Sequence, residues 1–174
     1  MLVPWSDVLA YWREAEEESW RPYYTERGFA TWEEWRMAYR AALALPSREW
    51  SLVPANDIPS WFIGGFQGWK KYRPTGESAT TFATVAQSPI LLENAKIAAL
   101  VDDLHATTFI GLRCGNDIAL IDGTHRASAY AYRAAQGMSL PACQVYIADI
   151  AENERTLFDQ FRRDIPAAKK DHGA

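Results

Sequence analysis

The organisation of this chain is clearest in Ile118-Ala-Leu-Ile-Asp-Gly-Thr-His-Arg-Ala-Ser-Ala-Tyr130. The apolar run stops at Asp122-Gly123 and continues as an alanine-rich helical pattern, which predicts a strand, a tight turn and the N-terminus of a helix. We expect the Thr124 hydroxyl to cap this helix and Gly123 to let the backbone approach a ligand closely. Because the first N–H groups of a helix have no partner within it, this geometry favours a bound anion.

Two side chains in the first predicted helical turn bear on this anion site. Arg126 carries a planar set of donors that suits phosphate or carboxylate, and His125 is a donor that titrates near neutral pH. The alternative is that the turn serves folding alone and that both side chains are solvated surface. A helix N-terminus tolerates nearby cations poorly unless an anion is present, so the ligand class most consistent with the pattern is a phosphate, such as that of a nucleotide.

The same residues resemble a known family. The segment from Asp122 to Tyr130 resembles the Gly-Cys-His-Arg segment of sulfiredoxins and the Asp-Gly-x-x-Arg segment of ParB-like domains and related free-serine kinases. Residues 94–104 are similar to the helix that precedes the paired strands of sulfiredoxin, and residues 140–146 look like the strand that follows. The resemblance covers roughly residues 80–160 and leaves the first half of the chain unexplained.

This resemblance implies a mixed α+β fold, with a small sheet and flanking helices, that holds a nucleotide phosphate at Gly123, Thr124, His125 and Arg126. Lys96 falls where sulfiredoxins place a lysine that contacts the nucleotide. Thr124 stands where sulfiredoxins carry their reactive cysteine, so we do not expect a sulfinic acid reductase. The Thr124-His125 pair also departs from the acidic-Arg-Arg pattern of ParB proteins that bind a cytidine nucleotide.

Composition and charge bound the possible functions. The chain has 174 residues, of which 48% are hydrophobic and 23% charged, enough for one sizeable core. We expect a helical, aromatic-rich region over residues 1–79 packed on a ParB/sulfiredoxin-like domain over 80–165, followed by a disordered tail over 166–174. The net charge of −4 disfavours nucleic acid as a partner, because nucleic-acid binding rests on phosphate neutralisation. The oligomeric state is left open.

Two further features point to an ordinary cytoplasmic protein. Cys114 and Cys143 lie in separate predicted strands without Cys-x-x-Cys spacing, which favours core thiols over a disulfide or metal site. No stretch approaches the roughly 18 apolar residues of a membrane span, and the N-terminus lacks the pattern of a signal peptide. We therefore expect a cytoplasmic location and no membrane partner.

Helical patterns dominate the first half. Ser6 is expected to cap a helix that ends near Arg21-Pro22, and Thr31-Trp-Glu-Glu34 is a capping box for a second helix that Pro46 stops. The acidic residues 16–18 are expected on a solvated face. In the second half, the patterns predict a helix from Ser88-Pro89 to residue 104, a hairpin over 109–121, a helix that stops at Gln136-Gly137, a strand over 145–147 and a last helix over 153–163.

A glycine-rich segment, residues 62–68, is flanked by Trp61 and Trp69 and followed by Lys70. Aromatic and basic side chains on such a segment favour a loop that closes over a bound ligand, so we expect these three residues in the substrate pocket. A structural connector whose glycines allow tight turns is the equally supported alternative. Most of the eight tryptophans, such as Trp12 on a predicted helix face, are expected in the core.

Few residues are candidates for catalysis. Asp122 is placed to bind Mg²⁺ or to orient His125, although an Asp before Gly is equally a turn former, and Glu93 lies near Lys96. The function that we predict is a nucleotide- or phosphate-binding enzyme that transfers a phosphoryl group or hydrolyses a phosphate ester or nucleotide. Its cofactor would be a nucleoside triphosphate or diphosphate, with Mg²⁺ as an optional partner. The alternative is a non-catalytic or DNA-associated ParB-like module.

Overall fold

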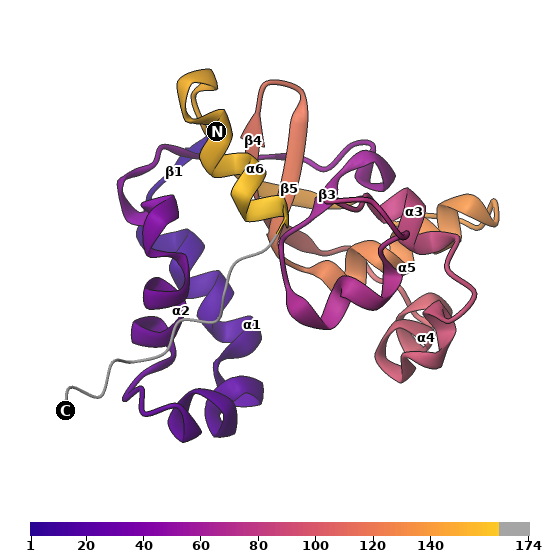
Figure 1. The fold of residues 1–174 in the computed structure, drawn as a ribbon, viewed down its shortest axis with the longest axis horizontal. Helices are drawn as coiled ribbons and strands as arrows, with labels where there is room; N and C mark the ends of the chain where they lie inside the picture. The colour runs from indigo at the N-terminus through magenta and orange to yellow at the C-terminus, as the bar shows by residue number, and fades with distance from the viewer. Residues whose placement is uncertain (164–174) are drawn as a thin grey trace.

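The computed structural model describes residues 1–163 and contains a mixed six-stranded sheet with helices on both faces (Figure 1). The strand order is β1-β2-β6-β4-β5-β3, in which β4 runs parallel to β6, β3 runs parallel to β5 and the other neighbours are antiparallel. This architecture confirms the expected α+β class. The strands are β1 Leu2–Val3, β2 Trp50–Pro54, β3 Phe62–Ile63, β4 Thr108–Cys114, β5 Asp117–Asp122 and β6 Gln144–Asp149.

Two hydrophobic cores lie on opposite faces of the sheet because successive strand side chains point to opposite sides. In β4, Phe109 faces one core and Ile110 the other. Helices α3, α4 and α5 cover the Phe109 face, and α1, α2 and α6 cover the Ile110 face (Figure 1). The helices are α1 Trp5–Glu26, α2 Trp32–Arg40, α3 Phe82–Ala86, α4 Ala95–Asp102, α5 Thr124–Ala135 and α6 Arg155–Arg163.

The first 79 residues supply strands as well as the predicted helices. Strand β2 pairs with β6 over five residues, and β3 pairs with β5 through Phe62 and Ile63. Strand β1 adds to the outer edge of β2. The prediction of a helical first part did not include these strands. Strands of two residues such as β1 and β3 leave no periodic pattern to detect, and the five residues of β2 show no clear alternation of apolar and polar side chains. Residues 1–79 contribute three of the six strands of one sheet.

Three predicted helix ends differ from the structure. Helix α1 begins after Pro4, so Ser6 lies inside the helix and does not cap it. The helix continues through Pro22 to Glu26, because the turn after Pro22 buries Tyr24 against the α2 side chains. Helix α4 begins at Ala95 rather than at residue 88. The Asn94 side chain caps the helix, because its Oδ1 accepts hydrogen bonds from the backbone N–H groups of Lys96 and Ile97. Residues 91–93 form a separate turn.

Other local predictions are confirmed. Thr31 caps α2 by accepting a bond from the N–H of Glu34, whose carboxylate reaches back to the N–H of Ala30. Strands β4 and β5 form the predicted hairpin, and the residue after the C-cap of α5 is Gly137, with a positive φ of 67°. The tail predicted for residues 166–174 lies outside the described residues. No helix in residues 1–163 is long and apolar enough to cross a membrane.

Candidate functional site

The candidate site lies where β3 and β5 end side by side. These strands are parallel neighbours, so their carboxyl ends share one edge of the sheet, which is the place where open α/β sheets bind ligands. Gly64 follows β3, and Gly123 follows β5 and precedes α5. Gly123 has a φ of +96°, and a Cβ at this position would lie 2.5 Å from Cδ1 of Phe109. The fold itself therefore requires glycine here, whether or not a ligand approaches.

The prediction that Thr124 caps this helix was wrong. Gly123 is the N-cap residue of α5, and no side chain caps the helix. Thr124 is the first helical residue, and its side chain is buried with a residue exposure of 7%. Its carbonyl oxygen accepts a bond from the Ser128 hydroxyl one turn later. The free N–H groups of the first turn therefore keep the partial positive charge of a helix N-terminus.

Arg126 links several elements at this edge of the sheet by hydrogen bonds. Its guanidinium donates to Asp122 Oδ2 at 2.7 Å, and to Tyr11 and the carbonyl oxygen of Thr108 at 3.3 Å each. It also donates to the hydroxyl of Thr107. Burial alone would lower the pKa of Arg126, but the carboxylate of Asp122 and the Tyr11 hydroxyl outweigh it and raise the pKa. Arg126 thus connects α5 with β4, β5 and α1 through bonds from both of its terminal nitrogens, Nη1 and Nη2.

Glu16 is the carboxylate that the sequence placed wrongly on a solvated face. Its side chain is 14% exposed, because Arg36 of α2 packs across it and donates to Glu16 Oε2 from Nε at 2.8 Å and also from Nη2. Burial raises the pKa of Glu16 to about 7; Arg36 opposes this shift, while the charge of Asp122 and a hydrogen bond with it add to it. Burial beside Asp122 therefore favours the protonated form of Glu16.

Arg40, one helical turn after Arg36, is the most unusual charged group of the site. It is 2% exposed, and none of its guanidinium nitrogens has a hydrogen-bond partner among the described residues. Its Cζ lies 4.8 Å from the ring centroid of Phe66 and 5.6 Å from that of Phe161. Burial, and next the charge of Arg36, lower the pKa of Arg40 to about 9.

The balance of these buried charges is positive. Three guanidinium groups, those of Arg36, Arg40 and Arg126, accompany the two carboxyl groups of Glu16 and Asp122. Among these five groups, and within residues 1–163, at least one positive charge is therefore uncompensated, and a second remains whenever Glu16 is protonated. This balance adds to the potential of the helix N-terminus and favours anions at this edge of the sheet.

Three of the predicted site residues meet on the solvent side of α5. The His125 ring packs edge-on against Trp69, with 5.0 Å between the ring centroids. Burial and the nearby charge of Lys96 lower the pKa of His125 to about 4, so the imidazole is neutral at pH 7. Lys96 itself is exposed at the start of α4. A cation, a neutral imidazole and an indole ring thus lie around one helix end.

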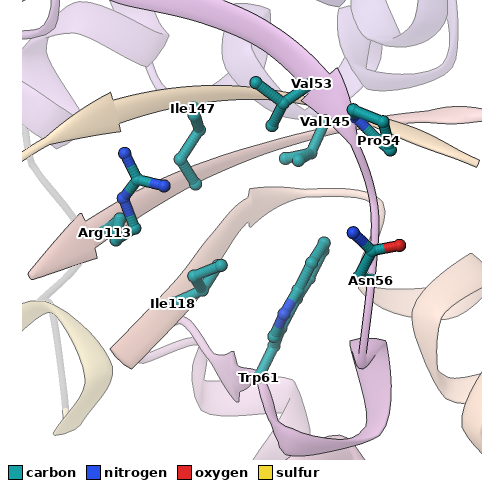
Figure 2. Close-up of a pocket in the computed structure, with 8 residues that line it drawn as sticks. All are labelled: Val53, Pro54, Asn56, Trp61, Arg113, Ile118, Val145 and Ile147. Atoms are coloured by element: carbon teal, nitrogen blue, oxygen red, sulfur yellow. The ribbon is translucent and has the colours of Figure 1, made fainter. Parts of the chain in front are cut away.

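Of the other predicted residues, Glu93 and Lys70 are exposed and Trp61 lies in a different part of the structure. Glu93 is exposed in the turn before α4, and its side chain makes no hydrogen bond or ion pair within residues 1–163. Lys70 is exposed in the turn over residues 67–72. Trp61 is buried, packs edge-on against Phe109 at 6.0 Å and lines a different cavity, on the face of the sheet (Figure 2).

A magnesium ion does not fit at Asp122. The carboxylate already accepts a bond from Arg126 and lies beside Glu16, while further guanidinium groups surround the pair. Within the part of the chain that the structure describes, no three His, Cys, Asp or Glu side chains are grouped to hold a metal ion. Mg²⁺ prefers carboxylate oxygens that are free of competing cations, so we derive no step through it.

Sequence reasoning missed the contributions of α1 and α2. Trp32, Arg36 and Arg40 are spaced by four residues and so lie along one face of α2, the face that begins with a fully buried tryptophan. That spacing was a usable signal that two arginines would be buried. Tyr11 and Glu16 gave no such signal, because their burial depends on how α1 packs against β4 and α2.

Comparisons of the chain with protein-family models, curated proteins and solved structures gave no match. The resemblance to ParB-like domains and sulfiredoxins therefore stays a prediction.

Proposed function

We propose that this protein binds the phosphate group of a nucleoside diphosphate or triphosphate at the N-terminus of α5. The observation that carries the proposal is the uncapped first turn of α5 together with Lys96, His125 and Trp69 around it. Backbone N–H groups and the ammonium of Lys96 supply the donors that phosphate oxygens need. The resemblance to the ParB/sulfiredoxin superfamily supports the same ligand, and the cytoplasm remains the proposed location.

Each residue of the site has a distinct role in this proposal. Lys96 pairs with the phosphate, and the edge of Trp69 offers an apolar contact for the sugar or base. Neutral His125 donates a hydrogen bond to a phosphate oxygen, and a bound anion would raise its pKa from the low value of the free protein. Arg126 acts as a positioning residue, because its donors hold Asp122 and Tyr11.

The proposed reaction is the transfer of the terminal phosphoryl group of the nucleotide to a hydroxyl group of a small molecule or to water. A new P–O bond forms to the attacking oxygen, the P–O bond to the bridging oxygen breaks, and the shortened nucleotide leaves. The phosphate oxygens carry the developing charge, which the helix end and Lys96 would stabilise. Unprotonated at pH 7, His125 is the group at this helix end that can accept the proton of the attacking hydroxyl. We assign no role in the reaction to Glu93, and Asp122 acts through its pair with Arg126.

Calorimetric titration with ADP and ATP, with and without Mg²⁺ and followed by product analysis, tests the proposal. Replacing Lys96 by Gln should weaken binding by about tenfold or more, since charge-assisted hydrogen bonds contribute about 1.5–3 kcal/mol. Lys71→Gln is the matched control, because Lys71 is exposed and lies over the ring of Tyr72. Equal affinities of the wild type and Lys96→Gln would contradict the site. Binding without any product would favour the non-catalytic alternative.

A further inference from the structure

A second site lies away from α5, in a cavity of about 310 Å³ on the Phe109 face of the sheet. A crossover connection contributes to its lining. The connection from β2 to β3, residues 55–61, must cross over β6, β4 and β5, a span of roughly 19 Å at about 4.8 Å per strand. Ala55, Ile58 and Trp61 of this crossover are buried in the same core as Phe109, so the crossover passes over this face.

The crossover and the sheet together form the walls of the cavity. Figure 2 shows Asn56 and Trp61 on the crossover side and Arg113 at the far end, near Ile147. Helices α3, α4 and α5 pack over the sheet around Phe109, near the start of β4. The cavity lies on the same face of the sheet near the other end of β4, beside Arg113. The lining is apolar apart from two side chains: Val53, Pro54, Trp61, Ile118, Val145 and Ile147 surround Asn56 and Arg113.

The charge of Arg113 is already neutralised. Arg113 and Asp149 are register partners on β4 and β6, and the guanidinium donates to both carboxylate oxygens, from Nε at 2.6 Å and from Nη2 at 2.9 Å. The carboxylate raises the pKa of Arg113, so the pair stays ionic and carries no net charge. Nη1 makes no hydrogen bond within residues 1–163, and it is the donor left for a ligand.

We propose that this cavity binds a small neutral carbonyl compound with a compact apolar body, such as an aromatic amide. The volume corresponds to roughly ten water molecules at about 30 Å³ each, which suits a ligand of about ten non-hydrogen atoms. The apolar lining takes the body of the ligand, Nη1 of Arg113 donates to its carbonyl oxygen, and Asn56 contacts a polar group at the other end. A carboxylate is disfavoured because Asp149 already balances the cation.

The proposal is independent of the phosphate site and can be tested separately with benzamide and benzoate. These two probes have nearly the same shape and differ in charge. In ¹H–¹⁵N NMR titrations of the whole protein, millimolar benzamide should shift the Trp61 indole and Asn56 side-chain signals, and benzoate should bind several-fold more weakly. The His125 signals should not move. Absence of benzamide shifts at Trp61 and Asn56, or tighter binding of benzoate, would overturn the proposal.

Two variants complete the test. Ile118→Trp should fill the cavity from the half-buried start of β5 and abolish the benzamide shifts. Asp149→Asn should leave the fold intact, because Asp149 is 67% exposed, and should reverse the preference to benzoate by freeing the charge of Arg113. Unchanged binding in Ile118→Trp would place the probe elsewhere. An unchanged preference in Asp149→Asn would show that Arg113 does not contact the ligand.

Discussion

Arg36 and Arg40 lie one turn apart on α2, yet their environments differ in a way that stability measurements can detect. Arg36 is paired with Glu16, whereas Arg40 has no hydrogen-bond partner within residues 1–163. Replacing Arg40 by Met should raise the free energy of unfolding by about 1 kcal/mol or more, because an unsatisfied buried donor costs about 1–3 kcal/mol.

The matched substitution Arg36→Met should lower the free energy of unfolding. Arg36→Met leaves Glu16 buried without its partner, and breaking a buried ion pair in this way costs about 3–5 kcal/mol. Urea denaturation of both variants at pH 8 measures the difference. Equal losses of stability in the two variants would mean that the aromatic rings around Arg40 compensate its charge fully.

The raised pKa of Glu16 predicts a specific pH dependence of stability. The folded-state pKa is about 7, above the ordinary value of 4.5, so the folded state binds the proton more tightly than the unfolded chain. Its contribution to stability is present below pH 4.5 and is lost as the pH rises through about 7. Between about pH 5 and pH 8 the wild type should therefore lose stability relative to Glu16→Gln, by about 1.4 kcal/mol for each unit of pKa shift.

Comparison of the two proteins isolates Glu16 from other groups. His125 acts in the opposite direction, because its folded-state pKa of about 4 lies below the ordinary value of 6.5. Its contribution to stability is present above pH 6.5 and is lost as the pH falls towards about 4. This effect is present in both proteins and cancels in the difference. Parallel curves of unfolding free energy against pH for the wild type and Glu16→Gln would show that Glu16 keeps an ordinary pKa.

Among the elements, the turn between β5 and α5 is the most constrained. Gly123 has a positive φ, and a Cβ there would meet the ring of Phe109 at 2.5 Å. Gly76 has a similar φ of +89°, but a Cβ there would meet nothing within 4 Å, which makes it a matched control. Alanine at a positive φ lowers the free energy of unfolding by roughly 1–2 kcal/mol in both variants. Gly123→Ala should lower it further, because the Phe109 ring must also move. Similar melting temperatures of the two variants would contradict this.

The elements that the sequence predicted well are those with a local signal. The hairpin of β4 and β5 and the capped helix α2 carry turn residues and caps at fixed positions, and the start of α5 follows an apolar strand directly. The two-residue strands β1 and β3 carry no such local signal. Pro22 predicted the end of the first helix wrongly, since it lies inside α1.

The same distinction holds for the candidate site. Gly123, His125 and Lys96 could be proposed because they belong to one short pattern and its resemblance, and they stay a prediction. Glu16 and Arg40 were not, because their burial comes from contacts between helices and the sheet that no local spacing encodes. The bonds of Arg126 likewise depend on Tyr11, 115 residues away.

At the scale of the whole molecule, the sheet predicts that the second half cannot fold alone. A fragment beginning at Thr80 lacks β2 and β3, so it exposes the edge of β6 on one side and the edge of β5 on the other. Unpaired strand edges of this kind promote aggregation. We expect the fragment to aggregate or to melt without cooperativity, as size-exclusion chromatography and thermal circular dichroism would show. A fragment that melts cooperatively at the temperature of the full chain would show that residues 1–79 are an appendage.

The position of β6 between β2 and β4 has a consequence for biosynthesis. The ribosome makes the β1 and β2 segments first and the β4–β5 hairpin later, but the strand that joins them is the last of the six to be synthesised. Until it emerges, β2 and β4 both lack the strand that pairs with them, and each presents unpaired backbone N–H and C=O groups that another chain can bind. The order of synthesis therefore delays completion of the sheet until its last strand is made.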